Sequence, residues 1–163
     1  MKVIVSDTTS LIVLEALHTI KLLCSVFESI LIPQAVLNEL YAGSPNILQK
    51  IHDAGCMEVI RLEPSEQLAS LQVILDNGEA EAITLAIERQ LPILIDERKG
   101  RTIAIQKQLV VTGFAGLLIL AVKQSVLTPT EAQQLLDQAI SNRFRLSNKL
   151  YQQISAYFKQ QDS

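Results

Sequence analysis

The sequence predicts an α/β fold in which a central, mostly parallel sheet is flanked by helices, in the three-layer manner of a Rossmann-like domain. Short apolar runs alternate with helix-spaced segments along the whole chain, a pattern typical of parallel sheets covered on both faces. Two of the apolar runs, residues 3–5 and 92–95, are followed closely by an aspartate that precedes a helix. Proline and glycine residues stand where several helices should begin and end.

Each expected strand is a short apolar run between polar or turn residues. The strands are expected at Val3–Val5, Glu28–Ile32, Met57–Leu62, Pro92–Ile95 and Leu109–Val111. The helices are expected at Thr8–Leu17, Ile20–Phe27, Pro33–Tyr41, Asn46–Ala54, Glu66–Leu75, Glu79–Gln90, Glu97–Gln108, Gly113–Gln124, Glu131–Ile140 and Leu146–Gln160. Pro33 can open a helix because the N–H that it lacks has no partner there. Thr128 and Glu131 have the spacing of a capping box.

The length and composition favour one globular domain over residues 1–163, with a core at about 1–125 and C-terminal helices at about 129–160. Hydrophobic residues make up 48% and charged residues 19% of the chain, and the net charge is −3. This balance does not suit a general nucleic-acid coat, which needs many Lys and Arg contacts to phosphates. Asp7 breaks the N-terminal apolar run, and residues 110–122 fall short of the roughly 20 residues of a spanning helix. We therefore expect a cytoplasmic protein with no membrane association.

Cys24 and Cys56 are the two cysteines. Two thiols provide neither the disulfide framework of a small secreted domain nor a zinc-binding spacing. Because both lie among apolar residues, we expect small core residues.

Asp7 and Asp96 share a setting, since each ends an apolar run and precedes a helix. If the two strands are parallel, both carboxylates emerge at the same edge of the sheet, where α/β proteins bind ligands. The alternative is that each aspartate caps the helix that follows it, a common role for Asp.

Glu79 lies on the apolar stripe of its predicted helix. Successive residues of a helix are about 100° apart, which places Glu79 with Ile83 and Ala86 and places Glu81 on the polar face. An inward carboxylate needs a partner because burying an unpaired charge is costly. A first-turn Glu favoured by the helix dipole is the alternative, but it does not explain the inward placement.

Four carboxylates, those of Asp7, Glu39, Glu79 and Asp96, are therefore expected to form an acidic pocket, although Glu39 alone reads as a solvated residue. Oxygen ligands without His or Cys suit Mg²⁺ or Mn²⁺, which can activate water at a phosphoryl group. Basic residues beside Asp96 suit a nucleic-acid backbone, or else form an ordinary solvated face; they are Arg98, Lys99, Arg101 and Lys107. Hydroxyl contacts from Thr8, Ser10 or Thr112 are weaker candidates.

The order of these motifs resembles the PIN-domain ribonucleases, which include the VapC-like toxins of toxin–antitoxin systems. The resemblance covers about residues 1–125. Its motifs are the strand followed by Asp7-Thr8, Val36–Leu40 (VLNEL), Gly78–Ile83 (GEAEAI), Asp96-Glu97-Arg98 and Val111–Gly116 (VTGFAG).

The resemblance implies a Mg²⁺- or Mn²⁺-dependent endoribonuclease in which Asp7, Glu39, Glu79 and Asp96 hold the metal and cleave RNA. The family's third acid is usually Asp, and here Glu79 and Glu81 both come close to that position. Glu97 stands where some members have a second Asp and can assist the metal. The resemblance further implies an RNA substrate, a cognate antitoxin and a homodimer.

Two other readings remain open at this point. One is a PIN-like module that binds RNA or protein without cleaving it. The other is a receiver-like phosphoacceptor domain, which also places Asp at strand ends but requires a Lys directly after its last strand. Neither Lys107 nor Lys123 has that position, so the sequence does not favour the receiver interpretation.

Overall fold

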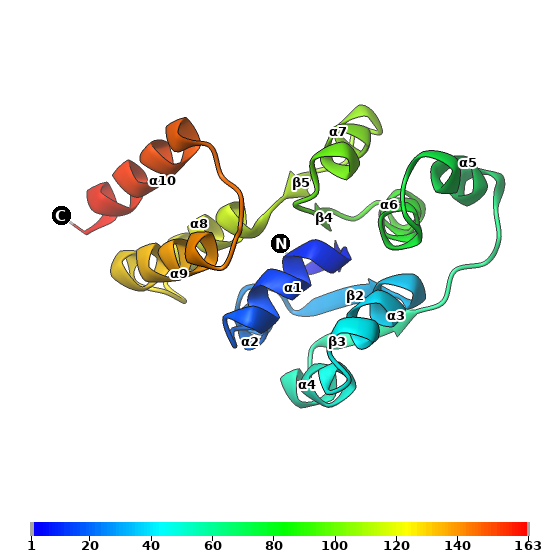
Figure 1. Cartoon of the computed structure of the whole chain (residues 1–163), viewed down its shortest axis with the longest axis horizontal. Helices are drawn as coiled ribbons and strands as arrows, with labels where there is room; N and C mark the ends of the chain where they lie inside the picture. The colour runs from blue at the N-terminus through cyan, green and yellow to red at the C-terminus, as the bar shows by residue number, and fades with distance from the viewer. Residues whose placement is uncertain (1, 163) are drawn as a thin grey trace.

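The computed structural model describes residues 2–162 and contains a five-stranded parallel sheet with strand order β3-β2-β1-β4-β5 (Figure 1). The strands are β1 (Val3–Ser6), β2 (Ser29–Pro33), β3 (Met57–Ile60), β4 (Ile93–Leu94) and β5 (Val111–Thr112). Every neighbouring pair is parallel. The prediction of an α/β fold with a parallel sheet is confirmed, and the carboxyl ends of all five strands meet at one edge.

Every helix that the sequence predicts is present, with shifted ends. The helices are α1 (Thr8–Ala16), α2 (Lys21–Val26), α3 (Gln34–Gly43), α4 (Ile47–Ala54), α5 (Glu66–Ile74), α6 (Asn77–Arg89), α7 (Arg98–Gln106), α8 (Phe114–Lys123), α9 (Pro129–Ser141) and α10 (Asn148–Gln161). Pro33 is the cap of α3 rather than its first residue. Within residues 2–162, no helix combines the length and the apolar character needed to cross a membrane.

Two strands differ from their predicted bounds for reasons that lie in neighbouring elements. β3 ends at Ile60 because its partner Pro33 is the last residue of β2. β5 begins at Val111 rather than Leu109 because the residues just before it form the turn that ends α7. Gln108 has a left-handed φ of 65°, and Leu109 donates its N–H to Ala104.

The alternation of side chains along the strands builds one apolar core on each face of the sheet. Ile4, Ile30 and Leu94 belong to the core formed with α1–α4 and α8–α10. Val5, Leu31 and the residues flanking Leu94 belong to the core formed with α5–α7. Figure 1 shows α8, α9 and α10 together at one end of the molecule, where α9 packs against both α8 and α10.

Side-chain caps begin several of the helices, including those that follow the strand ends. The predicted capping box is confirmed, since Thr128 Oγ1 accepts the N–H of Glu131 at 3.1 Å and Glu131 Oε1 accepts the N–H of Thr128 at 2.9 Å. The side-chain caps are Asp7, Ser65, Asp76, Glu97, Thr128 and Ser147.

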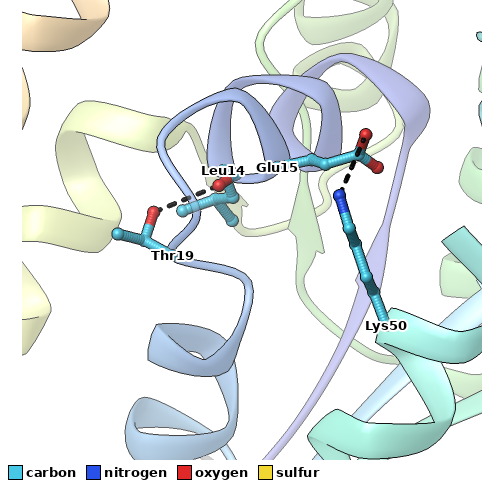
Figure 2. Close-up of polar contacts among 4 residues, drawn as sticks. All are labelled: Leu14, Glu15, Thr19 and Lys50. Atoms are coloured by element: carbon cyan, nitrogen blue, oxygen red, sulfur yellow. Dashed lines mark hydrogen bonds and ion pairs between the residues drawn. The ribbon is translucent and has the colours of Figure 1, made fainter. Parts of the chain in front are cut away.

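The region around α1 also illustrates how the helices are held together (Figure 2). Thr19 Oγ1 donates a hydrogen bond of 3.3 Å to the carbonyl of Leu14, just beyond the last turn of α1. Lys50 Nζ on α4 lies 3.7 Å from Glu15 Oε1 on α1. The ion pair joins two helices that are far apart in the sequence.

The interpretation of the two cysteines as unpaired core residues was wrong. Cys24 on α2 and Cys56, just before β3, form a disulfide across 32 residues of sequence, with Cα atoms 5.5 Å apart. The sequence pattern did not reveal the pair because the two residues meet only when α2 packs beside β2 and β3.

Candidate acidic site at the carboxyl edge of the sheet

Ser10 brings Asp7 and Asp96 into one cluster. Asp7 follows β1 directly, and Asp96 follows β4, which pairs with β1. The Ser10 N–H donates to Asp7 Oδ1 at 3.3 Å, and the Ser10 hydroxyl donates to Asp96 Oδ2 at 2.6 Å. Asp7 therefore caps α1, as the alternative interpretation expected, and it also lies beside Asp96, as the site interpretation expected.

Asp7 is fully buried, and its second oxygen, Oδ2, has no hydrogen-bond partner among the described residues. Burial raises the pKa of this carboxyl to about 8, assisted by the nearby charges of Asp96 and Asp76 and opposed by hydrogen bonding to Ser10. A buried carboxylate of this kind carries an uncompensated desolvation cost unless a cation or a proton accompanies it.

Asp96 is held by the first amide of α8. The Phe114 N–H lies 3.0 Å from both carboxylate oxygens. Burial raises the pKa of Asp96, while hydrogen bonds from Ser10 and Phe114 and the positive charge of Arg101 oppose that rise. Arg101 is itself fixed, because its Nη1 donates to the carbonyl of Ile95 at 2.9 Å.

Glu79 faces inward, as its helical position predicted, and is 7% exposed. Its Oε2 has no donor among residues 2–162. Burial, together with contact with the carboxyls of Glu97 and Asp76, raises the pKa of Glu79 to about 9. The same contact lowers the pKa of Glu97, so a proton held between Glu79 and Glu97 resides on Glu79.

Glu39 is half-buried rather than fully solvated. Its carboxylate accepts the Thr8 hydroxyl at 2.5 Å and the Gly78 N–H at 3.0 Å. These two bonds place Glu39 between the start of α1, next to Asp7, and the start of α6, next to Glu79.

Glu81, the second glutamate that the sequence left open for the third acidic position, forms a hydrogen bond at the start of α3. Its Oε1 accepts the N–H of Ala35 at 3.0 Å, in the first turn of α3. This bond supplies a partner for one of the free N–H groups at a helix start and explains the polar face on which Glu81 lies. Of the two glutamates that match the third acidic position, Glu79 is the one beside Glu97.

Three glycines make room for three of the acids. A Cβ atom added to Gly78 would lie 2.6 Å from Glu39 Oε2, one on Gly100 would lie 2.6 Å from Glu79 Oε2, and one on Gly113 would lie 2.5 Å from Asp96 Oδ1. Any side chain at these positions would displace the neighbouring carboxylate. Gly78 of the GEAEAI motif and Gly113 of the VTGFAG motif are thus packing partners of the acids.

The acids have the oxygen ligands that a divalent cation prefers, but their side chains do not converge on a single coordination site. Within residues 2–162, no three His, Cys, Asp or Glu side chains lie close enough together to hold a metal ion. The donor set is nevertheless all oxygen, which suits Mg²⁺ or Mn²⁺. Asp7 and Glu79 each present a buried oxygen without a donor.

Of the basic residues predicted to suit a nucleic-acid backbone, the three nearest the start of α7 differ in exposure. Arg98 and Lys99 are exposed at the start of α7, while Arg101 is half-buried beside Asp96. Arg98 and Lys99 are therefore available to a ligand, and Arg101 contributes to the electrostatics of Asp96.

Sequence reasoning missed several residues of this cluster. Asp76, which was not singled out from the sequence, caps α6 by accepting the Glu79 N–H at 2.9 Å, and its charge acts on both Asp7 and Glu79. An acid directly before a helix whose third residue is Glu was the available signal. The bonds from Ser10 and Phe114 to Asp96 carried no such signal, because they depend on which strands are neighbours.

The fold and the acidic edge together define a PIN-type α/β domain. The family described as DUF3368: PIN domain matches residues 3–160, so the chain belongs to this family of PIN domains. PIN domains are generally nucleases and generally use divalent metal ions.

Among solved structures, the chain is similar to a PilT N-terminus domain protein from the hyperthermophilic archaeon Sulfolobus solfataricus. The TM-score is 0.55 and the identity 16%, over 73% of this chain and 92% of that one. At this identity the similarity concerns the fold. No match is found among curated proteins.

Proposed function

We propose that the protein is a metal-dependent endoribonuclease whose acidic edge binds Mg²⁺ or Mn²⁺. The observation that carries the proposal is the pair of buried carboxylate oxygens, Asp7 Oδ2 and Glu79 Oε2, that lack a donor among the described residues and belong to groups with raised pKa values. Buried acids of this kind are characteristic of sites that bind a cation or move a proton.

In the proposed mechanism, the acids that would hold the metal are Asp7, Glu39, Glu79 and Asp96, with Glu97 assisting. A bound divalent cation supplies water activation and neutralises charge at the phosphoryl group. Ser10 and the Phe114 N–H orient Asp96, and Thr8 orients Glu39. Because the pKa of Glu79 is raised to about 9, binding of a cation by Glu79 would be accompanied by release of a proton.

Cleavage of a labelled single-stranded RNA in Mg²⁺ or Mn²⁺ tests the proposal. Cleavage should stop in EDTA and fall on the order of a hundredfold or more in Asp7→Asn, which removes a metal-binding charge. Asp53→Asn is the matched control, since Asp53 is exposed on α4 and should leave cleavage unchanged. Cleavage that survives both EDTA and Asp7→Asn would overturn the mechanism.

The proposal includes a biological role as the cytoplasmic toxin of a toxin–antitoxin pair, acting as a homodimer under control of a cognate antitoxin. Its support is the resemblance of the GEAEAI and VTGFAG motifs to VapC-like toxins. Expression of the chain alone should arrest growth, and Asp7→Asn should relieve the arrest. Growth arrest that persists in Asp7→Asn would count against a toxin that acts through this site.

A non-catalytic PIN-like module that binds RNA or protein is the second candidate. The observation that favours it is that no three acids of the described chain lie within reach of one metal ion. RNA binding without cleavage in any divalent cation would decide for this candidate.

A further inference from the structure

A cleft of about 890 Å³ opens directly beside Asp96 and Glu97. Its walls are the first turns of α1, the start of α7 and the segment between α9 and α10, residues 142–147. A second cavity of about 720 Å³ shares Asp96, Arg98 and residues 144–147 with it. The segment 142–147, hereafter the arginine loop, thus borders the acidic site although it lies more than 40 residues away in the sequence.

The arginine loop is held in place by its central residue. The Phe144 ring packs edge-on against Phe114 at a centroid distance of 5.3 Å, and the Phe144 N–H donates to Ala139 at 2.9 Å. Phe114 is the residue whose N–H binds Asp96. The side chains on either side of Phe144, Arg143 and Arg145, are exposed and line the cleft.

The charges of the cleft complement a nucleic-acid backbone. Arg98, Arg143 and Arg145 line it together with the carboxylates of Asp96 and Glu97. Among residues 2–162, the one ion pair with an N–O distance within 4.0 Å is that of Lys50 with Glu15. The guanidinium groups of Arg98, Arg143 and Arg145 therefore have no carboxylate partner at that distance within the described residues. Guanidinium groups match phosphate geometry with two parallel hydrogen bonds.

We propose that Arg143 and Arg145 bind the backbone phosphates of single-stranded RNA and position the strand across the acidic edge. This inference rests on the proposed function, because the cleft leads to the site where that function places cleavage. It assigns substrate binding to a loop outside the motifs that identified the family. An acidic protein segment in the same cleft is the competing occupant.

The test is binding of a fluorescein-labelled single-stranded RNA of mixed sequence, followed by anisotropy in Ca²⁺, with intact RNA verified on a gel. The double variant Arg143→Ala/Arg145→Ala should bind roughly tenfold more weakly or worse. The slope of log affinity against log salt should fall by about 0.7 for each lost phosphate contact. Arg143→Lys/Arg145→Lys keeps both charges and should retain most of the salt slope.

The matched control is Arg61→Ala/Arg89→Ala, which removes the same charge from exposed positions outside the cleft. It should bind RNA as the unchanged protein does. Equal binding by the Arg143/Arg145 alanine variant, or equal weakening in the control, would overturn the proposal. The proposal would also be overturned if the alanine substitutions weakened binding of a labelled acidic peptide and left RNA binding unchanged.

The inference and the proposed function can fail separately. If the unchanged protein cleaves RNA and Arg143→Ala/Arg145→Ala cleaves it with the same KM, the arginine loop has no role in RNA binding, and the proposed nuclease activity is supported. If the unchanged protein binds RNA through these arginines but does not cleave it in Mg²⁺ or Mn²⁺, the role of the arginine loop is supported and the proposed nuclease activity is contradicted. Circular dichroism of each variant verifies that it is folded.

Discussion

The Ser10 hydroxyl lies 2.6 Å from Asp96 Oδ2, although the two residues are 86 positions apart in the sequence. Ser10 also binds Asp7 through its N–H, so one short side chain and its amide connect the acids at the ends of β1 and β4. This contact makes Ser10 a positioning residue whose removal can be tested.

Ser10→Ala should lower RNA cleavage roughly tenfold, since residues that orient metal-binding carboxylates have effects of 10- to 100-fold. Because the Ser10 hydrogen bond lowers the pKa of Asp96, its loss should also move the acidic limb of the pH–rate profile to higher pH. Ser25→Ala, on the exposed side of α2, is the control. Reduced cleavage with an unshifted profile would indicate a merely structural effect.

Gly78→Ala should impair cleavage while preserving the fold. The three atoms nearest the new Cβ would all belong to the Glu39 carboxylate, at 2.6–2.9 Å. Alanine is favourable within a helix by about 1 kcal/mol over glycine. We expect unchanged or higher thermal stability and roughly tenfold lower activity. Gly43→Ala is the matched control because nothing lies within 4 Å of its Cβ position. Equal activity of both variants would show that the position of Glu39 is unimportant.

In EDTA, the free energy of unfolding should decrease as the pH rises from about 4 to 9. The folded pKa values of Asp7, about 8, and Glu79, about 9, lie above their ordinary values of 3.8 and 4.5. The folded state therefore binds more protons than the unfolded state in this window, and stability falls with pH. Urea unfolding across this range measures the effect.

Asp7→Asn isolates the part of this pH dependence that one carboxyl contributes. The variant should lose less stability than the unchanged protein between pH 4 and 8 and should be the more stable of the two above pH 8. Asp53→Asn, on the exposed face of α4, should follow the unchanged protein. Identical pH profiles for Asp7→Asn and the unchanged protein would contradict the raised pKa of Asp7.

Breaking the Cys24–Cys56 disulfide should reduce the free energy of unfolding by about 2–4 kcal/mol, because a cross-link across 32 residues restricts the unfolded chain. Urea unfolding with and without reductant measures this change, and Cys24→Ser/Cys56→Ser should be insensitive to reductant. Alkylation of both thiols in the denatured, unreduced protein would show that the disulfide is absent.

Local patterns predicted the presence and order of the strands and helices, though not all of their bounds, and the burial of one acid. The position of Glu79 on the apolar stripe of α6 follows from helical periodicity alone, and the structure confirms it. Helix ends were less accurate, as at Gln108, where a left-handed residue ends α7 and delays β5. Such ends depend on single backbone angles that side-chain patterns do not report.

The sequence by itself determined the α/β class, the parallel sheet and the places of Asp7 and Asp96 after the ends of two strands, because periodicity and strand ends are local properties. Only the tertiary structure decided which groups hold those acids: Ser10 and Phe114 on Asp96, Thr8 and Gly78 on Glu39, and Glu97 beside Glu79. The tertiary structure also paired the cysteines and brought residues 142–147 to the site. Contacts of this kind join elements distant in sequence, and they exist only once the strand order and the helix packing are set.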